Sequence, residues 1–242
     1  MEARVQRVLI WTGPAMALMW IGAFLIVAGF IPPHDPGLTA DQIVDKYAEH
    51  TGAIKIGMVV SMAGSALLVP WGVAISGQLK RIDGARALAD VQMASCALLS
   101  LEFITPIAVW MATAFRFEDR APDVTQTMND LGWVLFMMVI WSLWVQLIAI
   151  AVAVLIDRRS EPILPRWLGY MSLWVAVLIL PAGTVLFFKD GPFAWNGLIG
   201  FYLPLASYCT WIASMTWCVH QALNRQIAEG TEPDIPAELV RL

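Results

Sequence analysis

The stretch Leu131–Ile156, LGWVLFMMVIWSLWVQLIAIAVAVLI, decides the fold because it holds no charged residue. The hydrocarbon core of a bilayer is about 30 Å thick, and a helix of about 20 mostly apolar residues crosses it. The stretch exceeds that length, and the polar pair Asn129 and Asp130 directly before it suits a helix start. It therefore predicts a transmembrane helix, which we place at residues 128–156.

Five other stretches have the length and hydrophobicity of a membrane span. They cover residues 8–31, 53–79, 88–115, 167–188 and 197–223. The chain of 242 residues is 59% hydrophobic and 14% charged, whereas soluble domains carry about 25% charged residues. We therefore predict an all-α polytopic membrane helix bundle with six transmembrane helices, forming a single transmembrane domain over residues 1–242.

The positive charges are divided unequally between the two sets of connecting loops. Cytoplasmic loops of membrane proteins are richer in Lys and Arg than the loops on the other side. Ten of the 15 Lys and Arg residues fall on the side that holds both termini, namely Arg4, Arg7, Lys80, Arg81, Arg86, Arg158, Arg159, Arg166, Arg225 and Arg241. We expect both termini, with a tail at residues 224–242, to be cytoplasmic in a multi-pass protein of the bacterial cytoplasmic (inner) membrane.

The first outer loop contains a helix-start signal. Thr39 and Gln42 have the spacing of a capping box, in which each side chain bonds the backbone N–H at the other position. Apolar residues then follow on one helical face. The pattern predicts a short amphipathic helix at residues 40–50, lying on the outer membrane interface.

Glu102 is the one ionisable residue near the middle of a predicted span. A carboxylate at that depth costs at least about 2.5–3.5 kcal/mol, so such residues face protein or water and often serve a function. Helical spacing of three, four and seven residues predicts a polar stripe through it, consisting of Gln92, Ser95, Glu102, Thr105 and Thr113. We expect a ligand-binding site formed by Glu102, Thr105, Ser95, Gln146 and Trp141.

A structural role for Glu102 is the alternative, and the sequence leaves both open. Burial raises the pKa of a carboxyl group, so a neutral Glu102 would donate a hydrogen bond across a helix interface. Gln146 and Ser142 of the fourth predicted span are the partners that we expect for this role.

Known catalytic, metal and cofactor motifs do not occur in the sequence. The three cysteines lie in apolar runs without CxxC spacing, and the three histidines do not share one side of the predicted bundle. Walker, HExxH, GxSxG and GxGxxG motifs are missing. A basic run that would bind nucleic acid is missing too. We expect no cofactor and no nucleic-acid partner, and we favour a non-enzymatic role without excluding catalysis.

Three stretches resemble segments of a known group of proteins. They are Thr125–Trp133 (TQTMNDLGW), Pro165–Tyr170 (PRWLGY) and Gly191–Gly197 (GPFAWNG). They are similar to a family of uncharacterised bacterial membrane proteins found in actinobacteria and sphingomonads, and the resemblance runs over most of the chain. It implies a six-helix membrane protein and no particular activity.

Three functions follow from these observations as hypotheses. The first is binding or transport of a small hydrophobic or amphipathic compound, with a proton link through Glu102 as an option. The second is a non-catalytic subunit of a larger membrane complex, or a homo-oligomer. The third is a membrane enzyme with a lipid-soluble substrate. In each case the lipid bilayer is the surrounding partner.

Overall fold

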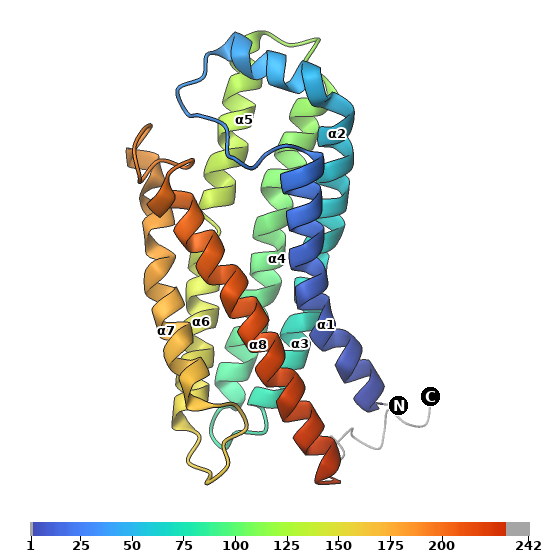
Figure 1. The fold of residues 1–242 in the computed structure, drawn as a ribbon, viewed down its shortest axis with the longest axis vertical. Coiled ribbons are helices and arrows are strands. Elements are labelled where there is room, and N and C mark those ends of the chain that lie inside the picture. The colour runs from blue at the N-terminus through green and yellow to red at the C-terminus, as the bar shows by residue number, and fades with distance from the viewer. Residues whose placement is uncertain (1, 231–242) are drawn as a thin grey trace.

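The structure, a computed structural model, describes residues 2–230. Every regular element in that range is a helix, and none of those residues forms a strand (Figure 1). In chain order the elements are α1 (Glu2–Trp20), η1 (Ile21–Val27), α2 (Ala40–Ala66), α3 (Leu68–Leu79), α4 (Arg86–Phe115), α5 (Pro122–Met137), α6 (Ile140–Ile156), α7 (Arg166–Leu178), η2 (Leu180–Phe187), η3 (Leu198–Tyr202) and α8 (Leu203–Ala228).

These elements combine into six helices that are long and apolar enough to cross a membrane. They run over Ala3–Val27, Ala40–Leu79, Arg86–Phe115, Pro122–Ile156, Arg166–Phe187 and Leu198–Ala228. The predicted all-α bundle with six candidate spans is therefore confirmed. The membrane side of the termini stays a prediction. Of the predicted cytoplasmic tail, residues 224–228 continue α8 and residues 231–242 lie outside the described residues.

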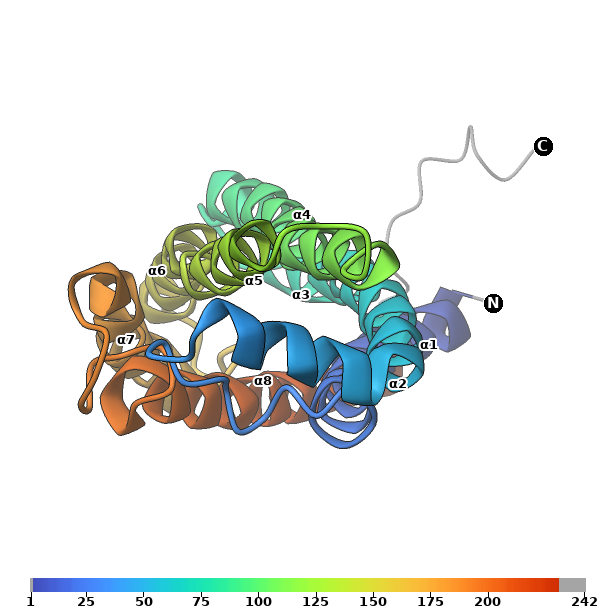
Figure 2. The same ribbon diagram turned by 90° about the horizontal axis from the view of Figure 1, so that it is seen from above.

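The spans run alternately in opposite directions, so α1 begins and α8 ends at the same end of the bundle (Figure 1). The turn between α3 and α4 and the loop between α6 and α7 lie at this end as well. We name it the basic end, because its described cations are Arg4, Arg7, Lys80, Arg81, Arg86, Arg158, Arg159, Arg166 and Arg225. Viewed along the bundle, α1 and α8 form one long side and α4, α5 and α6 form the other (Figure 2).

The first part of α2 lies across the opposite end of the bundle (Figure 2). The capping box predicted at Thr39 and Gln42 is present, and α2 bends at His50, whose φ and ψ are −130° and 20°. The amphipathic segment differs from the prediction in its surroundings. Ile43 and Tyr47 are buried in the protein core instead of facing lipid. This segment therefore covers the end of the bundle that is remote from the basic end.

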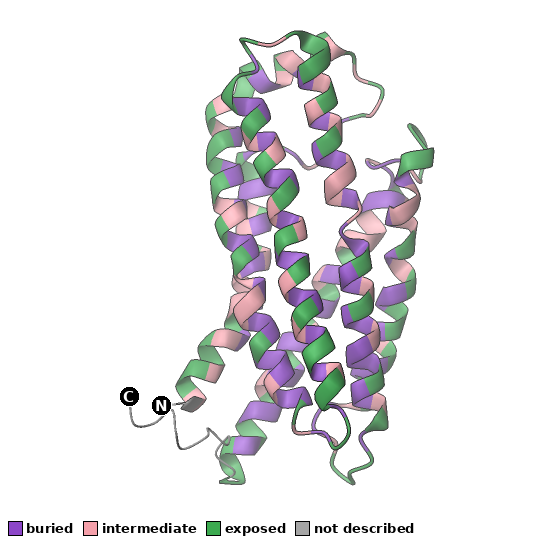
Figure 3. Cartoon of the chain, turned by 180° about the vertical axis from the view of Figure 1, so that it is seen from behind, coloured by how far each residue is buried: buried purple, intermediate pink, exposed green. Residues whose placement is uncertain are grey.

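Buried residues occupy the inward faces of the helices, and exposed residues occupy the outward faces (Figure 3). Many of the exposed side chains are large and apolar, as expected for surfaces that contact lipid tails. The interior is rich in aromatic rings. Trp133, for example, lies within 6.5 Å, between ring centroids, of Phe24, Phe30, His34, Trp110, Phe136, Trp195 and Phe201.

Every span except α4 departs from a regular α-helix. α1 continues into a π-helical segment, α2 and α3 meet at Leu67, and α5 and α6 meet at Met138 and Val139. α7 continues as 3₁₀ helix at Pro181, and a π-helical segment precedes Pro204 of α8. Proline has no N–H and breaks the regular hydrogen-bond ladder. The last two departures therefore have a cause in the sequence.

Candidate functional site

Glu102 lies on α4 at the edge of the α4–α6 interface and is half-buried. Its Oε2 accepts a hydrogen bond from the Ser142 hydroxyl of α6. Ser142 is one of the two partners that the structural hypothesis names. The contact joins the two helices directly, because one member comes from each of them.

The other predicted site residues differ in how far they are exposed. Thr105 is exposed, and its hydroxyl donates to the Leu101 carbonyl of its own helix at 2.9 Å. Trp141 is 54% exposed, whereas Ser95 and Gln146 are buried. The predicted set is thus divided between the lipid-facing surface and the interior. Whether any of its members binds a ligand stays a prediction.

Several buried polar side chains of the bundle have unsatisfied atoms. The amide atoms of Gln92 and Gln146, and the Tyr208 hydroxyl, form no hydrogen bond with any part of the chain that the structure describes. Buried polar groups in proteins are usually hydrogen-bonded, so such exceptions are costly. All of these atoms are inaccessible to solvent. A ligand on the surface of this conformation therefore does not reach them.

An apolar groove lies between α1 and α8, and we name it the α1–α8 groove. Its volume is about 490 Å³. This is within the roughly 300–1,000 Å³ that is usual for small-molecule sites. The groove is lined by Trp11, Pro14, Ala17, Leu18, Ile21, Cys209, Ile212, Ala213, Thr216, Trp217 and His220.

The two helices that form the groove run antiparallel, and two contacts define their alignment. The rings of Trp11 and His220 lie 6.0 Å apart between centroids, and Arg7 donates to the Asn224 side-chain oxygen at 3.4 Å. From Trp11 to Ile21, a helical rise of 1.5 Å per residue gives a length of about 15 Å. The groove therefore extends from the level of Trp11 and His220, beside the basic end, toward the middle of the bundle.

The sizes of the side chains explain why the space exists. Ala17 and Ala213 both line it and leave room between the helices, while Trp11 and Trp217 flank it and are 56% and 62% exposed. Thr216 forms part of the floor, where its hydroxyl accepts a hydrogen bond from Trp71 Nε1 at 3.2 Å. The floor is thus attached to α3, and the two tryptophans form walls that face lipid.

Close packing of α1 on α3 fixes one side of the groove. A Cβ atom at Gly13 would lie 2.5 Å from Trp71 Nε1, closer than real side chains approach. Glycine at this position therefore lets the α1 backbone lie directly on the Trp71 indole. Because Trp71 also bonds Thr216 of α8, one buried ring positions both helices that form the groove.

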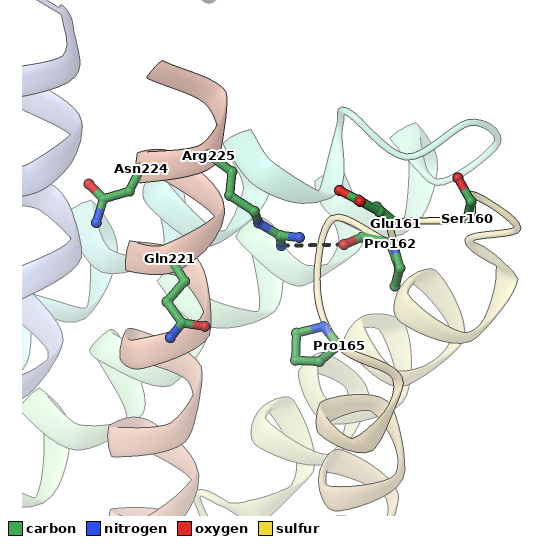
Figure 4. A pocket seen from close by; sticks show the side chains of 7 residues that line it. All are labelled: Ser160, Glu161, Pro162, Pro165, Gln221, Asn224 and Arg225. Atoms are coloured by element: carbon green, nitrogen blue, oxygen red, sulfur yellow. Dashed lines mark hydrogen bonds between the residues drawn. The ribbon is translucent and has the colours of Figure 1, made fainter. Parts of the chain in front are cut away.

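A second cavity lies at the basic end, beside the loop between α6 and α7. It has a volume of about 600 Å³ and is lined by Ser160, Glu161, Pro162, Pro165, Gln221, Asn224 and Arg225 (Figure 4). The Arg225 guanidinium extends from α8 to this loop, where Nη2 donates to the Pro162 and Ile163 carbonyls at 3.3 and 2.6 Å. Arg225 therefore holds the loop in place.

The opposite end of the bundle contains a buried histidine. Trp195 Nε1 donates to the His34 carbonyl at 2.7 Å, and the His34 ring packs against Phe30 at 4.9 Å between centroids. Burial lowers the pKa of His34 to about 4, and the positive charge of Lys46 adds to this effect. His34 is therefore neutral at physiological pH.

The nearby polar contacts centre on Asn129. Its Oδ1 accepts from the Tyr47 hydroxyl at 3.3 Å, and its backbone carbonyl accepts from Trp110 Nε1 at 3.3 Å. These bonds join the covering segment of α2 to α5, and α4 to α5. They close this end of the bundle.

Neither a metal site nor a known relative identifies the protein. Within residues 2–230, no three His, Cys, Asp or Glu side chains are placed to hold a metal ion. No protein-family model matches the chain, and searches of curated proteins and of solved structures find no match either. The resemblance to uncharacterised bacterial membrane proteins stays a prediction. The geometry of the groove is therefore the main guide to function.

The α1–α8 groove is not visible in the sequence. Its residues come from the first and last spans, and most of them are ordinary apolar residues of a membrane helix. Pro14 and the tryptophans were visible in the sequence, but nothing local indicates that α1 and α8 are neighbours.

Proposed function

We propose that this chain is an integral membrane protein that binds a small hydrophobic or amphipathic compound in the α1–α8 groove. The groove faces the lipid phase, so a membrane-soluble compound reaches it laterally. Trp11 and Trp217 contact the sides of the bound molecule.

One observation carries the proposal. The groove is an open apolar concavity on a surface with exposed apolar side chains, and its end near Trp11 is polar because His220 lines it and Arg7 lies one turn beyond. Apolar sites with a few polar groups at a defined position are typical of small-molecule binding. The graded polarity fits a compound with an apolar body and a polar end.

Glu102 has no part in this proposal, because it lies on α4 and does not line the groove. A proton link through Glu102 remains a separate hypothesis. The subunit and enzyme alternatives also remain hypotheses, and no particular contact of the described residues favours either of them.

Filling the groove tests the proposal. Ala213 is exposed and lines the groove, so Ala213→Trp places an indole where the ligand would lie. Ala108 is exposed on α4, away from the groove, and Ala108→Trp is the matched control. Native mass spectrometry of the protein in dodecylmaltoside, after addition of dioleoylphosphatidylcholine, measures how many lipid molecules stay bound.

We expect the wild type and Ala108→Trp to retain one more lipid than Ala213→Trp. Equal retention by all three proteins, with unchanged thermal stability, would contradict the proposal. Mass spectrometry also shows whether Ala213→Trp changes the oligomeric state, which would indicate that a second chain occupies the groove.

A further inference from the structure

We infer that the ligand of the α1–α8 groove is an anionic phospholipid whose phosphate lies against Arg7 and His220. This inference rests on the proposed function, because it identifies the molecule that the same groove binds. It follows from the positions of the polar groups along the groove and from the charge of the bundle end at which they lie.

The face of α1 that borders the groove has one polar end. Arg7, Trp11, Pro14, Leu18 and Ile21 follow one another at intervals of three or four residues, which places them on one side of the helix. The four residues after Arg7 all line the groove. An acyl chain lying along them therefore has its headgroup beside Arg7.

Arg7 is positioned to bind an anion. Its guanidinium is exposed and donates only a long bond, 3.4 Å, to the neutral side chain of Asn224. It forms no ion pair with any side chain whose placement is described. Arg81 and Arg159, in contrast, lie within 4.0 Å of carboxylates. A guanidinium without a counterion at a membrane surface attracts the phosphate of an anionic lipid.

His220 provides a second contact at the same level. Its ring meets Trp11 edge-on with centroids 6.0 Å apart, and it lines the end of the groove nearest the basic end. Its Nδ1 is inaccessible and has no hydrogen-bond partner in residues 2–230. The contact to the headgroup is therefore made through Nε2.

The depth of the two tryptophans agrees with a lipid headgroup at this position. Tryptophan side chains are enriched at the membrane–water interface, at the level of the headgroups. Trp11 lies one turn from Arg7, and both it and Trp217 flank the groove with more than half of their surface exposed. A headgroup at Arg7 and a chain between the indoles match this arrangement.

A second copy of the chain is a less suitable occupant of this groove. Two copies in one membrane, related by a twofold axis along the membrane normal, present the same face and the same end to each other. Arg4 and Arg7 of both copies would then come together at the basic end. Repulsion between these cations opposes that contact, whereas an acidic phosphate neutralises them.

The test uses an equal mixture of dioleoylphosphatidylglycerol and dioleoylphosphatidylcholine, added to the full chain in dodecylmaltoside and followed by native mass spectrometry. Arg7→Gln removes the cation beside the groove. Arg86→Gln is the matched control, because Arg86 is exposed at the basic end but belongs to α4, on the other long side of the bundle (Figure 2). Ala213→Trp blocks the groove itself.

We expect the wild type to retain phosphatidylglycerol over phosphatidylcholine. One membrane-surface cation contributes enough to change this ratio about fivefold, so Arg7→Gln lowers it by that factor. Arg86→Gln leaves the ratio unchanged, and Ala213→Trp removes both lipids from the groove.

The outcomes separate this inference from the proposed function. If Ala213→Trp removes bound lipid but Arg7→Gln leaves the ratio unchanged, the anionic headgroup is refuted and the groove still binds an amphipathic compound. If Ala213→Trp has no effect on either lipid, both ideas are refuted. Binding of radiolabelled inorganic phosphate to the lipid-free protein is measured as well. If phosphate binds and Arg7→Gln abolishes this binding, the site belongs to free phosphate and the lipid proposal is overturned.

Discussion

The hydrogen bond between Tyr47 and Asn129 gives a quantitative test of how the end of the bundle remote from the basic end is closed. Both side chains are fully buried, and the hydroxyl donates to Oδ1 at 3.3 Å. Tyr47→Phe removes this bond, at a cost of about 0.6–1 kcal/mol in a membrane protein. Asn129→Ala leaves the Tyr47 hydroxyl buried without this partner, at a cost of about 1–3 kcal/mol.

A double-mutant cycle isolates the contact itself. Reversible unfolding by dodecyl sulfate in bicelles gives the free energy of unfolding of the wild type, the single variants and the double variant. In the double variant no Tyr47 hydroxyl is left unpaired, so the combined loss is smaller than the sum of the two single losses. We expect a coupling energy of about 0.5–1.5 kcal/mol. Tyr170→Phe, at an exposed position, is the control and should show no coupling to Asn129→Ala. If the losses in free energy of unfolding of the two single variants add within about 0.3 kcal/mol, this bond does not help to close the end of the bundle.

Three further predictions concern single side chains. Because the pKa of His34 is lowered to about 4, the unfolded state takes up a proton first as pH falls below about 6.5. The free energy of unfolding that is due to neutral His34 is therefore fully present above pH 6.5 and is lost toward pH 4, by up to about 3 kcal/mol. Denaturation curves should show this loss in the wild type and in His50→Gln. They should not show it in His34→Gln. Glu102→Gln should keep the fold, because the amide oxygen still accepts a hydrogen bond from Ser142 of α6. If this variant loses pH-dependent or ligand-dependent behaviour, Glu102 has a functional role. If Glu102→Leu stabilises the protein and has no other effect, the role of Glu102 is structural. Gly132→Ala places a Cβ 2.3 Å from Trp110 Nε1, and so close an approach should cost about 2–3 kcal/mol. Better helix propensity returns about 1 kcal/mol, so unfolding measurements should show a net loss of about 1–2 kcal/mol. Equal or greater stability would show that α5 moves freely from α4.

Hydropathy predicts the number of spans because a helix that crosses the lipid must be mostly apolar along its whole length. A long uncharged run such as Leu131–Ile156 has no soluble alternative, and six such runs are found as six helices. The interior breaks are less visible. The junction of α5 and α6 at Met138 and Val139 contains no proline or glycine, so no local preference of these residues predicts it.

The candidate site was harder to predict than the fold. Glu102 stood out because a charge in hydrocarbon is rare, and its Ser142 partner was among those expected for a structural role. The α1–α8 groove depends instead on which helices are neighbours and on small side chains such as Ala17 and Ala213. Alanine is common in any membrane helix, so Ala17 and Ala213 do not indicate a groove in the sequence. They do so only when the fold places both of them between α1 and α8.

The two ends of the bundle differ in how they are covered, and this difference matters for the choice between a binding protein and a transporter. At the end remote from the basic end, the first part of α2 lies across the interior (Figure 2). Its own Ile43 and Tyr47 side chains are buried. Trp110 and Trp133 fill the space below, and both are fully buried. The α1–α8 groove, in contrast, is open to the side and begins beside the basic end. A compound held there, as we propose, would leave by the lipid phase from which it came. Passage across the membrane would require the covering segment and several aromatic rings to move. On these grounds we propose binding in the groove and not passage through the bundle.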